Sequence, residues 1–158
     1  MEKLRKILLI LLFVAIASVQ AQGRTKIDNV SGYEKLRKEL LEINRADTLT
    51  EWDMLILAIC WKESTFRKTT NKNYHGYMQM SRGYVKWVNQ LAKTKYTYDD
   101  ARVFRHAVRM HNLINKHLNP KKDIRKALRI HNPRTAYHSD ALRKIEIIKE
   151  HEKERLSL

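Results

Sequence analysis

The sequence predicts a single, mostly α-helical domain with one short irregular or hairpin segment after its second helix. The chain has 158 residues, which is enough for one domain and not comfortably for two. It contains only 4 Gly and 2 Pro, too few for a sandwich of many short strands joined by turns. Apolar residues recur at helical spacing along most of the chain, and a hydrophobic content of 43% is sufficient for a buried core.

The first 21 residues have the layout of a secretory signal peptide. Three basic residues, Lys3, Arg5 and Lys6, precede an uncharged apolar run over 8–17, and small residues suited to cleavage end at Ala21. The run is shorter than the roughly 20 residues that span a membrane, so cleavage is favoured over an uncleaved anchor. We therefore expect a secreted, periplasmic or extracellular protein with no membrane span after cleavage. Cleavage would leave 29 basic and 16 acidic residues, a net charge of +13.

A flexible N-terminal segment, residues 22–32, is expected before the folded domain, residues 33–158. Ser31 and Glu34 have the spacing of a capping box, in which each side chain bonds the backbone of the other. Apolar residues at helical spacing then predict a first helix that ends near Arg45.

The second helix is predicted over 50–64. Thr50 stands at its start, and Glu51 and Asp53 lie in the first turn, where the helix dipole favours acids. Residues 65–81 are polar and lose the apolar period, which indicates a loop or a small irregular hairpin.

The second half of the chain is predicted to be helical throughout, with short connections. The expected helices comprise a stretch over 84–92, a long helix that starts at Asp99 and Asp100 and stops at Asn119, a helix with Pro120 at its first position that ends before Pro133, and a last helix over 139–154.

Glu63 is the residue best placed to carry chemistry. It lies one helical turn after Ile59 and Cys60, so its carboxyl group continues the apolar stripe beside the irregular segment. Burial there disfavours the charged form and favours the protonated form that a general acid needs. Position alone is equally compatible with an acid that reaches solvent or pairs with Lys62 or Arg67.

Three motifs follow one another along the chain. They are Glu63-Ser64-Thr65-Phe66, Gly76-Tyr77-Met78-Gln79-Met80, and the Ala-Leu-Arg-Ile-His-Asn sequence over 127–132. This arrangement resembles the soluble lytic transglycosylase family, relatives of goose-type lysozymes, with a helix ending in Glu-Ser, then Gly-Leu-Met-Gln, then Ala-Leu-Ala-Ala-Tyr-Asn. The resemblance covers about residues 55–142, and it implies a lysozyme-like fold.

The resemblance also implies roles for individual residues. Glu63 corresponds to the catalytic acid of the family. The predicted substrate-binding residues are Ser64, Met78, Gln79, His131, Asn132 and Tyr137. Two positions depart from the family pattern, because Thr65 replaces a Gly and His131 replaces a Tyr that is expected to bond the catalytic acid. A neutral His131 could donate to Glu63, whereas a protonated ring would hold the carboxylate ionised and weaken the acid.

The distribution of acids favours a mechanism with one carboxyl group. Glycosidases that use water usually need two carboxylates, and no Asp or Glu occurs between Ser64 and Tyr98. As the resemblance implies, Glu63 would protonate the oxygen between N-acetylmuramic acid and N-acetylglucosamine. It would then accept the proton of the muramic acid 6-hydroxyl, which closes a 1,6-anhydro ring. No metal or cofactor is needed.

Three other functions remain open at this point. They are a hydrolytic lysozyme on the same fold, a catalytically weak or inactive cell-wall-binding module, and a basic nucleic-acid binder. The positive charge would attract anionic cell wall, and no nucleic-acid-binding motif accompanies it. The expected partner is peptidoglycan, within a secretion, conjugation or phage apparatus. The histidines lack the spacing of a helical zinc pair, and the single Cys excludes an intramolecular disulfide.

Overall fold

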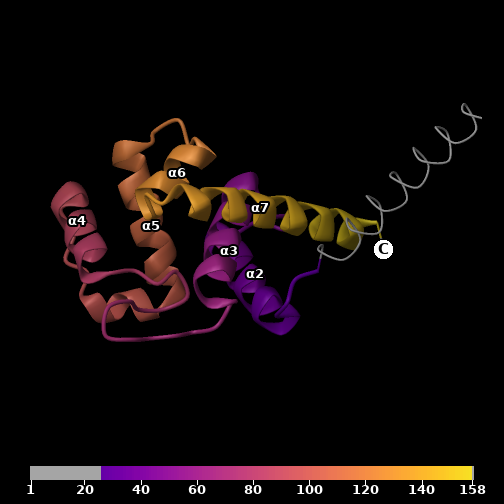
Figure 1. The fold of residues 1–158 in the computed structure, drawn as a ribbon, viewed down its shortest axis with the longest axis horizontal. Coiled ribbons are helices and arrows are strands. Elements are labelled where there is room, and N and C mark those ends of the chain that lie inside the picture. Colours follow the sequence, from indigo (N-terminus) through magenta and orange to yellow (C-terminus); the bar gives the residue numbers. More distant parts are fainter. Residues whose placement is uncertain (1–25, 158) are drawn as a thin grey trace, which may run out of the picture.

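The computed structural model describes residues 26–157, and within them the predicted mostly α-helical architecture is confirmed (Figure 1). The elements are α2 (Val30–Asn44), α3 (Glu51–Ser64), α4 (Arg82–Ala92), the 3-10 helix η1 (Tyr98–Arg102), α5 (Phe104–Leu118), α6 (Ile124–His131) and α7 (Thr135–Leu156). These described residues contain no β-strand. The segment between α3 and α4 has two isolated bridges, from His75 to Thr70 and to Met80, as expected of a small irregular hairpin. The predicted signal peptide lies outside the described residues.

Helix α3 is the centre of the fold. All residues from Leu55 to Trp61 are buried, so the helix is covered on every side. Helices α7 and α2 both pack against it, and α7 crosses it in Figure 1. Thr50 begins α3 as predicted, because its hydroxyl accepts a hydrogen bond from Asp53 N at 3.2 Å while Asp53 Oδ2 accepts one from Thr50 N at 2.8 Å. Glu63 consequently lies in the last turn, at the opposite end.

Polar contacts fasten α7 to the two helices beneath it. The buried Glu152 carboxylate accepts hydrogen bonds from the Tyr33 hydroxyl at 2.7 Å and from Arg37 Nε at 2.8 Å. Burial acts to raise the pKa of Glu152, but the hydrogen bonds from Arg37 and Tyr33 outweigh it and lower that pKa. Lys62 Nζ forms an ion pair with Asp140 at 2.7 Å. Helix α3 is thus held in place by α7.

The start of α2 differs from the prediction. Ser31 and Glu34 do not form the expected capping box, because the helix begins earlier, with Asn29 as its N-cap. Asn29 Oδ1 accepts from Gly32 N at 3.0 Å, and its Nδ2 donates to the carbonyl of Thr65 at 2.8 Å. The bond to Thr65 comes from the end of α3, a tertiary contact that no local pattern reveals.

The prediction that residues 22–32 are flexible is also partly wrong, since the second half of this segment is packed against the domain. Ile27 is buried, and Trp61 Nε1 donates to Asp28 Oδ2 at 3.2 Å. The first residues of α2 are part of the same segment. From residue 27 onward, burial and hydrogen bonds therefore fix this part of the chain.

The long helix expected from Asp99 is broken in two. Residues Tyr98–Arg102 form η1, Val103 is extended, and α5 begins at Phe104. Asp100 accepts from Thr97 N in a capping box and contacts His106 Nδ1 at 2.9 Å. Residues six positions apart lie on different faces of a continuous helix, so the contact between Asp100 and His106 requires the break.

Pro120 is not the first residue of the next helix. It lies in a turn, and α6 begins at Ile124 with Asp123 as its N-cap. The Asn119 side chain closes this turn, because it donates to the Asp123 carbonyl at 2.8 Å and accepts from Asp123 N at 3.0 Å. Because these two hydrogen bonds hold residues 119–123 in a turn, α6 begins only at Ile124.

Helix α7 begins at Thr135, four residues before the predicted start at 139. Its first turn is held by packing and by the preceding turn, because Tyr137 is buried and His138 Nε2 lies 2.6 Å from the carbonyl of Asn132. Although α7 has 22 residues, neither it nor any other helix within 26–157 is long and apolar enough to cross a membrane.

Candidate active site

A cleft of about 460 Å³ opens beside the C-terminal end of α3. It contains four predicted site residues: Glu63, Gln79, His131 and Asn132. The other lining residues are Tyr74, Met80, Ser81, Tyr84, Pro133 and Arg134. They belong to three parts of the chain: the end of α3, the segment over 74–84, and the turn between α6 and α7. The fold therefore brings the three motifs together at one site.

Glu63 is positioned to act on a molecule in this cleft. Its side chain is 20% exposed, and its Oε1 atom lies 3.5 Å from Nε2 of His131, whose side chain is 4% exposed. That distance lies within the range of an ion pair and is longer than an ordinary N–H···O hydrogen bond. His131 is thus adjacent to the carboxyl group, as predicted, and Glu63 remains accessible to a ligand.

The backbone directly after Glu63 is tightly constrained. Thr65 and Phe66 both have left-handed conformations, with φ of 52° and 57°, which is unusual for two consecutive residues with side chains. Asn29 bonds the Thr65 carbonyl, and the buried Phe66 ring packs at centroid distances of 5.6 Å from Tyr33 and 5.8 Å from Trp61. Strain of this kind is retained where surrounding contacts enforce it, and here it ends α3 immediately after the acid.

Ser64 does not line the cleft. Its side chain is buried, and its hydroxyl lies 2.8 Å from two carbonyl oxygens, that of Cys60 in α3 and that of Tyr77 in the following segment. The hydroxyl joins the helix that carries Glu63 to the wall opposite. The structure therefore gives Ser64 a positioning contact in place of the predicted contact with substrate.

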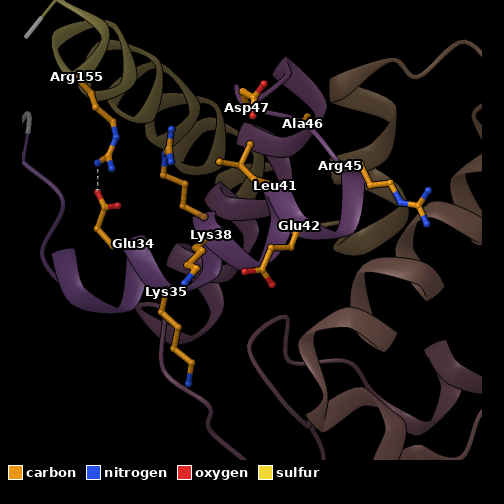
Figure 2. Close-up of a pocket in the computed structure, with 10 residues that line it drawn as sticks. Glu34, Lys35, Lys38, Leu41, Glu42, Arg45, Ala46, Asp47 and Arg155 are labelled. Atoms are coloured by element: carbon orange, nitrogen blue, oxygen red, sulfur yellow. Dashed lines mark hydrogen bonds and ion pairs between the residues drawn. The ribbon is translucent and has the colours of Figure 1, made fainter.

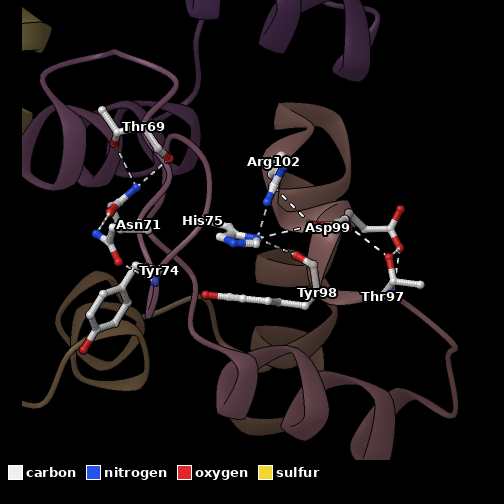
Figure 3. Close-up of polar contacts among 10 residues, drawn as sticks. Thr69, Asn71, Tyr74, His75, Thr97, Tyr98, Asp99 and Arg102 are labelled. Carbon is white, nitrogen blue, oxygen red and sulfur yellow. Dashed lines mark hydrogen bonds and ion pairs between the residues drawn. The ribbon is translucent and has the colours of Figure 1, made fainter.

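The Met-Gln motif divides between the core and the cleft. Met78 is fully buried, while Met80 borders the cleft. Gln79 has a left-handed φ of 46°, and its Nε2 atom lies within 2.6–3.0 Å of Gly76 O, Thr69 O and Thr69 Oγ1. Its Oε1 accepts from Asn71 Nδ2 at 3.3 Å (Figure 3). Gln79 is thus at the cleft as predicted, but its amide is engaged in holding the segment's shape.

Close packing against η1 fixes the same segment from behind. Gly76 has φ of +78°, and a Cβ atom there would lie 2.0 Å from the Ala101 carbonyl oxygen, so only glycine fits. The adjacent His75 ring stacks on Tyr98 with centroids 3.7 Å apart, and its Nδ1 atom lies 3.2 Å from the Tyr98 carbonyl (Figure 3). The Arg82 guanidinium lies over the Tyr98 ring at 4.4 Å.

Asn132 and Tyr137 complete the predicted set. Asn132 borders the cleft, where its Oδ1 accepts from Arg134 N at 3.1 Å. Tyr137 is buried beneath the cleft, with its ring centroid 6.1 Å from that of His131. Burial, and next the charge of Glu63, raise the pKa of the Tyr137 hydroxyl, which keeps it protonated beside the acid. Tyr137 therefore packs against His131 and does not line the cleft.

Sequence reasoning missed two contributors to the cleft wall. Arg134 is the one Lys or Arg among the described residues that line the cleft, and Pro133 lies beside it. Both follow the Asn132 motif directly, which is the signal that could have identified them. Two aromatic residues, Tyr74 and Tyr84, also line the cleft. Tyr74 is 46% exposed, whereas Tyr84 is buried, and burial raises the pKa of the Tyr84 hydroxyl.

Another hollow, of about 670 Å³, lies on the outer face of α2 (Figure 2). Its lining mixes acids with bases, and Glu34 pairs with Arg155 at 2.6 Å. Leu41 is its largest apolar residue. None of the predicted site residues is present, and opposite charges compensate one another, so we assign no role to this surface.

Comparison of the chain with protein families, curated proteins and solved structures found no match. Within residues 26–157, no three potential metal ligands of the His, Cys, Asp or Glu type are grouped together. A functional proposal therefore depends on the cleft geometry and on the motif resemblance.

Proposed function

We propose that this chain is a lytic transglycosylase with a lysozyme-like fold, which cleaves the β-1,4 bond between N-acetylmuramic acid and N-acetylglucosamine in peptidoglycan. The observation that carries the proposal is the convergence of Glu63, Gln79, His131 and Asn132 on one cleft, although they come from distant parts of the chain. The resemblance implies that residues of these three motifs meet beside an accessible carboxyl group, and their convergence on the cleft supports a functional reading of the motifs.

The composition of the cleft supports the proposed reaction over hydrolysis. Among the described residues that line it, Glu63 is the only acid. Water-using glycosidases place a second carboxylate across the scissile bond, about 5 to 10 Å away. A site with one acid is better suited to a reaction in which the substrate supplies its own nucleophile.

The proposed reaction needs no group beyond Glu63 and the glycan. The protonated carboxyl group gives its proton to the glycosidic oxygen as the bond from that oxygen to C1 of the muramic acid breaks. The 6-hydroxyl oxygen of the same sugar then bonds to C1, and the Glu63 carboxylate accepts its proton. The products are an N-acetylglucosamine end and a 1,6-anhydro end, and Glu63 returns to its initial state.

Other features of the cleft suit a glycan ligand in the cell envelope. The exposed Tyr74 ring offers a face for an apolar sugar surface. Arg134 adds a cation next to a substrate that carries peptide carboxylates. The predicted signal peptide and the net positive charge would bring the protein to anionic cell wall outside the cytoplasm, within a secretion, conjugation or phage apparatus.

The test is digestion of purified peptidoglycan by the wild type and by Glu63→Gln, followed by mass spectrometry of the fragments. Gln keeps the size of Glu63 but cannot protonate an ether oxygen, so cleavage should fall by about 10²–10⁴-fold. Glu51→Gln is the matched control, because Glu51 is exposed at the other end of the same helix and should be dispensable.

Each alternative has its own outcome in this experiment. Fragments with mainly reducing ends would establish water as the acceptor and favour a hydrolytic lysozyme. Binding to insoluble wall without cleavage would favour a wall-binding module. Equal activity of wild type and Glu63→Gln would refute the site assignment.

A further inference from the structure

Two buried histidines lie in series behind Glu63. His111, in α5, is completely buried, and its ring centroid is 6.1 Å from that of His131 in α6. His131 Nε2 in turn lies 3.5 Å from Glu63 Oε1. The proposed reaction moves protons through Glu63 alone and gives His111 no role, so the presence of this residue in the core calls for a separate explanation.

A chain of hydrogen bonds determines which nitrogen of His111 carries the hydrogen. Backbone groups of Asp123 fix the orientation of the Asn119 amide, since one donates to its oxygen and the other accepts from its nitrogen. Asn119 Nδ2 donates to Asn115 Oδ1 at 3.2 Å, which leaves Asn115 Nδ2 facing His111 Nε2 at 3.4 Å. An amide nitrogen only donates, so Nε2 accepts, and a neutral His111 carries its hydrogen on Nδ1.

His111 is held neutral by its surroundings. Burial, and next the proximity of His131, lower the pKa of His111 to about 3. The same ring packs against Trp52, with centroids 5.6 Å apart. At the pH of a cell envelope, His111 is therefore an uncharged N–H donor fixed within the core.

His131 has the complementary arrangement. While Glu63 is ionised its carboxylate only accepts, so a neutral His131 that contacts it carries its hydrogen on Nε2 and presents a lone pair at Nδ1. Nδ1 of His111 and Nδ1 of His131 are both buried, and neither has a hydrogen-bond partner among the described residues. One is thus a buried donor and the other a buried acceptor, on adjacent rings.

We propose that His111 is a positioning residue that donates its Nδ1 hydrogen to His131 Nδ1, and thereby holds His131 neutral with its own hydrogen directed at Glu63. The two nitrogens, each buried without a partner among the described residues and carried on adjacent rings, would satisfy one another through this bond. With the lone pair of His131 Nδ1 occupied in this way, a second proton on His131 would place its Nδ1–H directly against the Nδ1–H of His111. Imidazolium formation, which would hold Glu63 ionised, is consequently disfavoured.

The other groups around His131 leave this role to His111. Tyr84 from α4 and Tyr137 from α7 face the ring at centroid distances of 5.9 and 6.1 Å, and burial raises the pKa of both hydroxyls, so both stay neutral. Arg134 lines the same cleft and is the only other charged side chain there besides Glu63 among the described residues. The inference deepens the proposed function and rests on it for its catalytic consequence.

The test is nitrogen-15 NMR of the histidine rings in the intact protein, which reports the tautomer and the protonation of each imidazole without reference to activity. In the wild type, His131 should be neutral with its hydrogen on Nε2. His111→Phe keeps a ring against Trp52 and removes the donor, so His131 should gain its proton about tenfold more readily, a rise of about one pH unit in its titration midpoint. His111→Asn places an amide N–H where Nδ1–H stood and should restore the wild-type titration.

A wild-type His131 with its hydrogen on Nδ1, or a titration that neither substitution moves, would overturn the proposal. If His111→Phe does not fold, the wild-type tautomer and the Asn variant still decide the question. In the pH–rate profile on peptidoglycan, His111→Phe should move the acidic limb of kcat upward by the same amount and leave KM unchanged. Failure of the transglycosylase proposal would abolish that profile but would not alter the NMR result, so the two failures are distinguishable.

Discussion

Acid should destabilise this fold through His111 in particular, and the size of the effect follows from its burial. The His111 imidazole has a pKa of about 3 in the folded protein, whereas histidine in an unfolded chain titrates near pH 6.5. Between these values the unfolded chain binds a proton that the folded protein excludes. The free energy of unfolding therefore has its full value above about pH 6.5, and it is progressively lost as the pH falls toward 3.

The expected magnitude is large relative to the stability of a small domain. Each pH unit between the two values is worth about 1.4 kcal/mol. The loss is about 2 kcal/mol at pH 5 and approaches about 5 kcal/mol near pH 3, against a total of about 5–15 kcal/mol for a typical protein. His111→Phe removes this titration while it preserves most of the packing against Trp52.

The measurement is urea unfolding of the wild type and His111→Phe at several pH values between 7.5 and 5. Groups that titrate alike in both proteins cancel in the difference between their free energies of unfolding, and the easier protonation of His131 expected in His111→Phe adds in the same direction. That difference should shift by at least about 2 kcal/mol in favour of His111→Phe as the pH falls from 7 to 5. His117→Phe is the control, because His117 is exposed on the same helix and its substitution should leave the pH dependence unchanged. A difference that is constant with pH would refute the reasoning.

Three further predictions concern other parts of the molecule. His131→Tyr should extend wall cleavage to lower pH, because a phenol gains no proton there, and superimposable pH–rate profiles would mean that His131 does not control Glu63. Gly76→Ala should lower the free energy of unfolding by about 2 kcal/mol or more, measured by thermal melting, since its Cβ would clash with a backbone carbonyl at positive φ; an unchanged melting temperature would contradict the tight packing. Glu152→Gln should cost about 3 kcal/mol in urea unfolding, because it leaves the partly buried Arg37 without its anion, and a double variant with Arg37→Met should recover part of that loss.

The features that sequence reasoning predicted correctly are governed by neighbouring residues. Thr50 caps α3 through Asp53, three residues on, and the apolar run from Leu55 to Trp61 requires burial wherever the helix lies. The irregular segment over 65–81 was predictable because it lacks any apolar period. Glu63 was identifiable since an acid at the end of an apolar helix is unusual.

The features that escaped prediction depend on contacts between distant segments. Asn29 begins α2 early because it bonds a carbonyl at the end of α3. Ser64 and Met78 belong to motifs that meet at the cleft yet they do not line it, because the chain reverses through left-handed residues that no periodicity reveals. His111 lies next to His131 only because α5 and α6 pack together. Sequence motifs indicated which segments matter, and the backbone path decided which side chains meet.

The arrangement of α3 beneath α7 has a consequence for how the protein is made. The most apolar of the described helices, α3, is synthesised before α7, the helix that covers it. Because such long-range contacts form only when both partners are available, the nascent chain cannot complete its core until α7 has been made. For a protein that we propose to be exported, this delay would keep the precursor unfolded, which is the state in which a chain can pass through a membrane channel. The same property would make any chain that stops short of α7 a target for proteolysis.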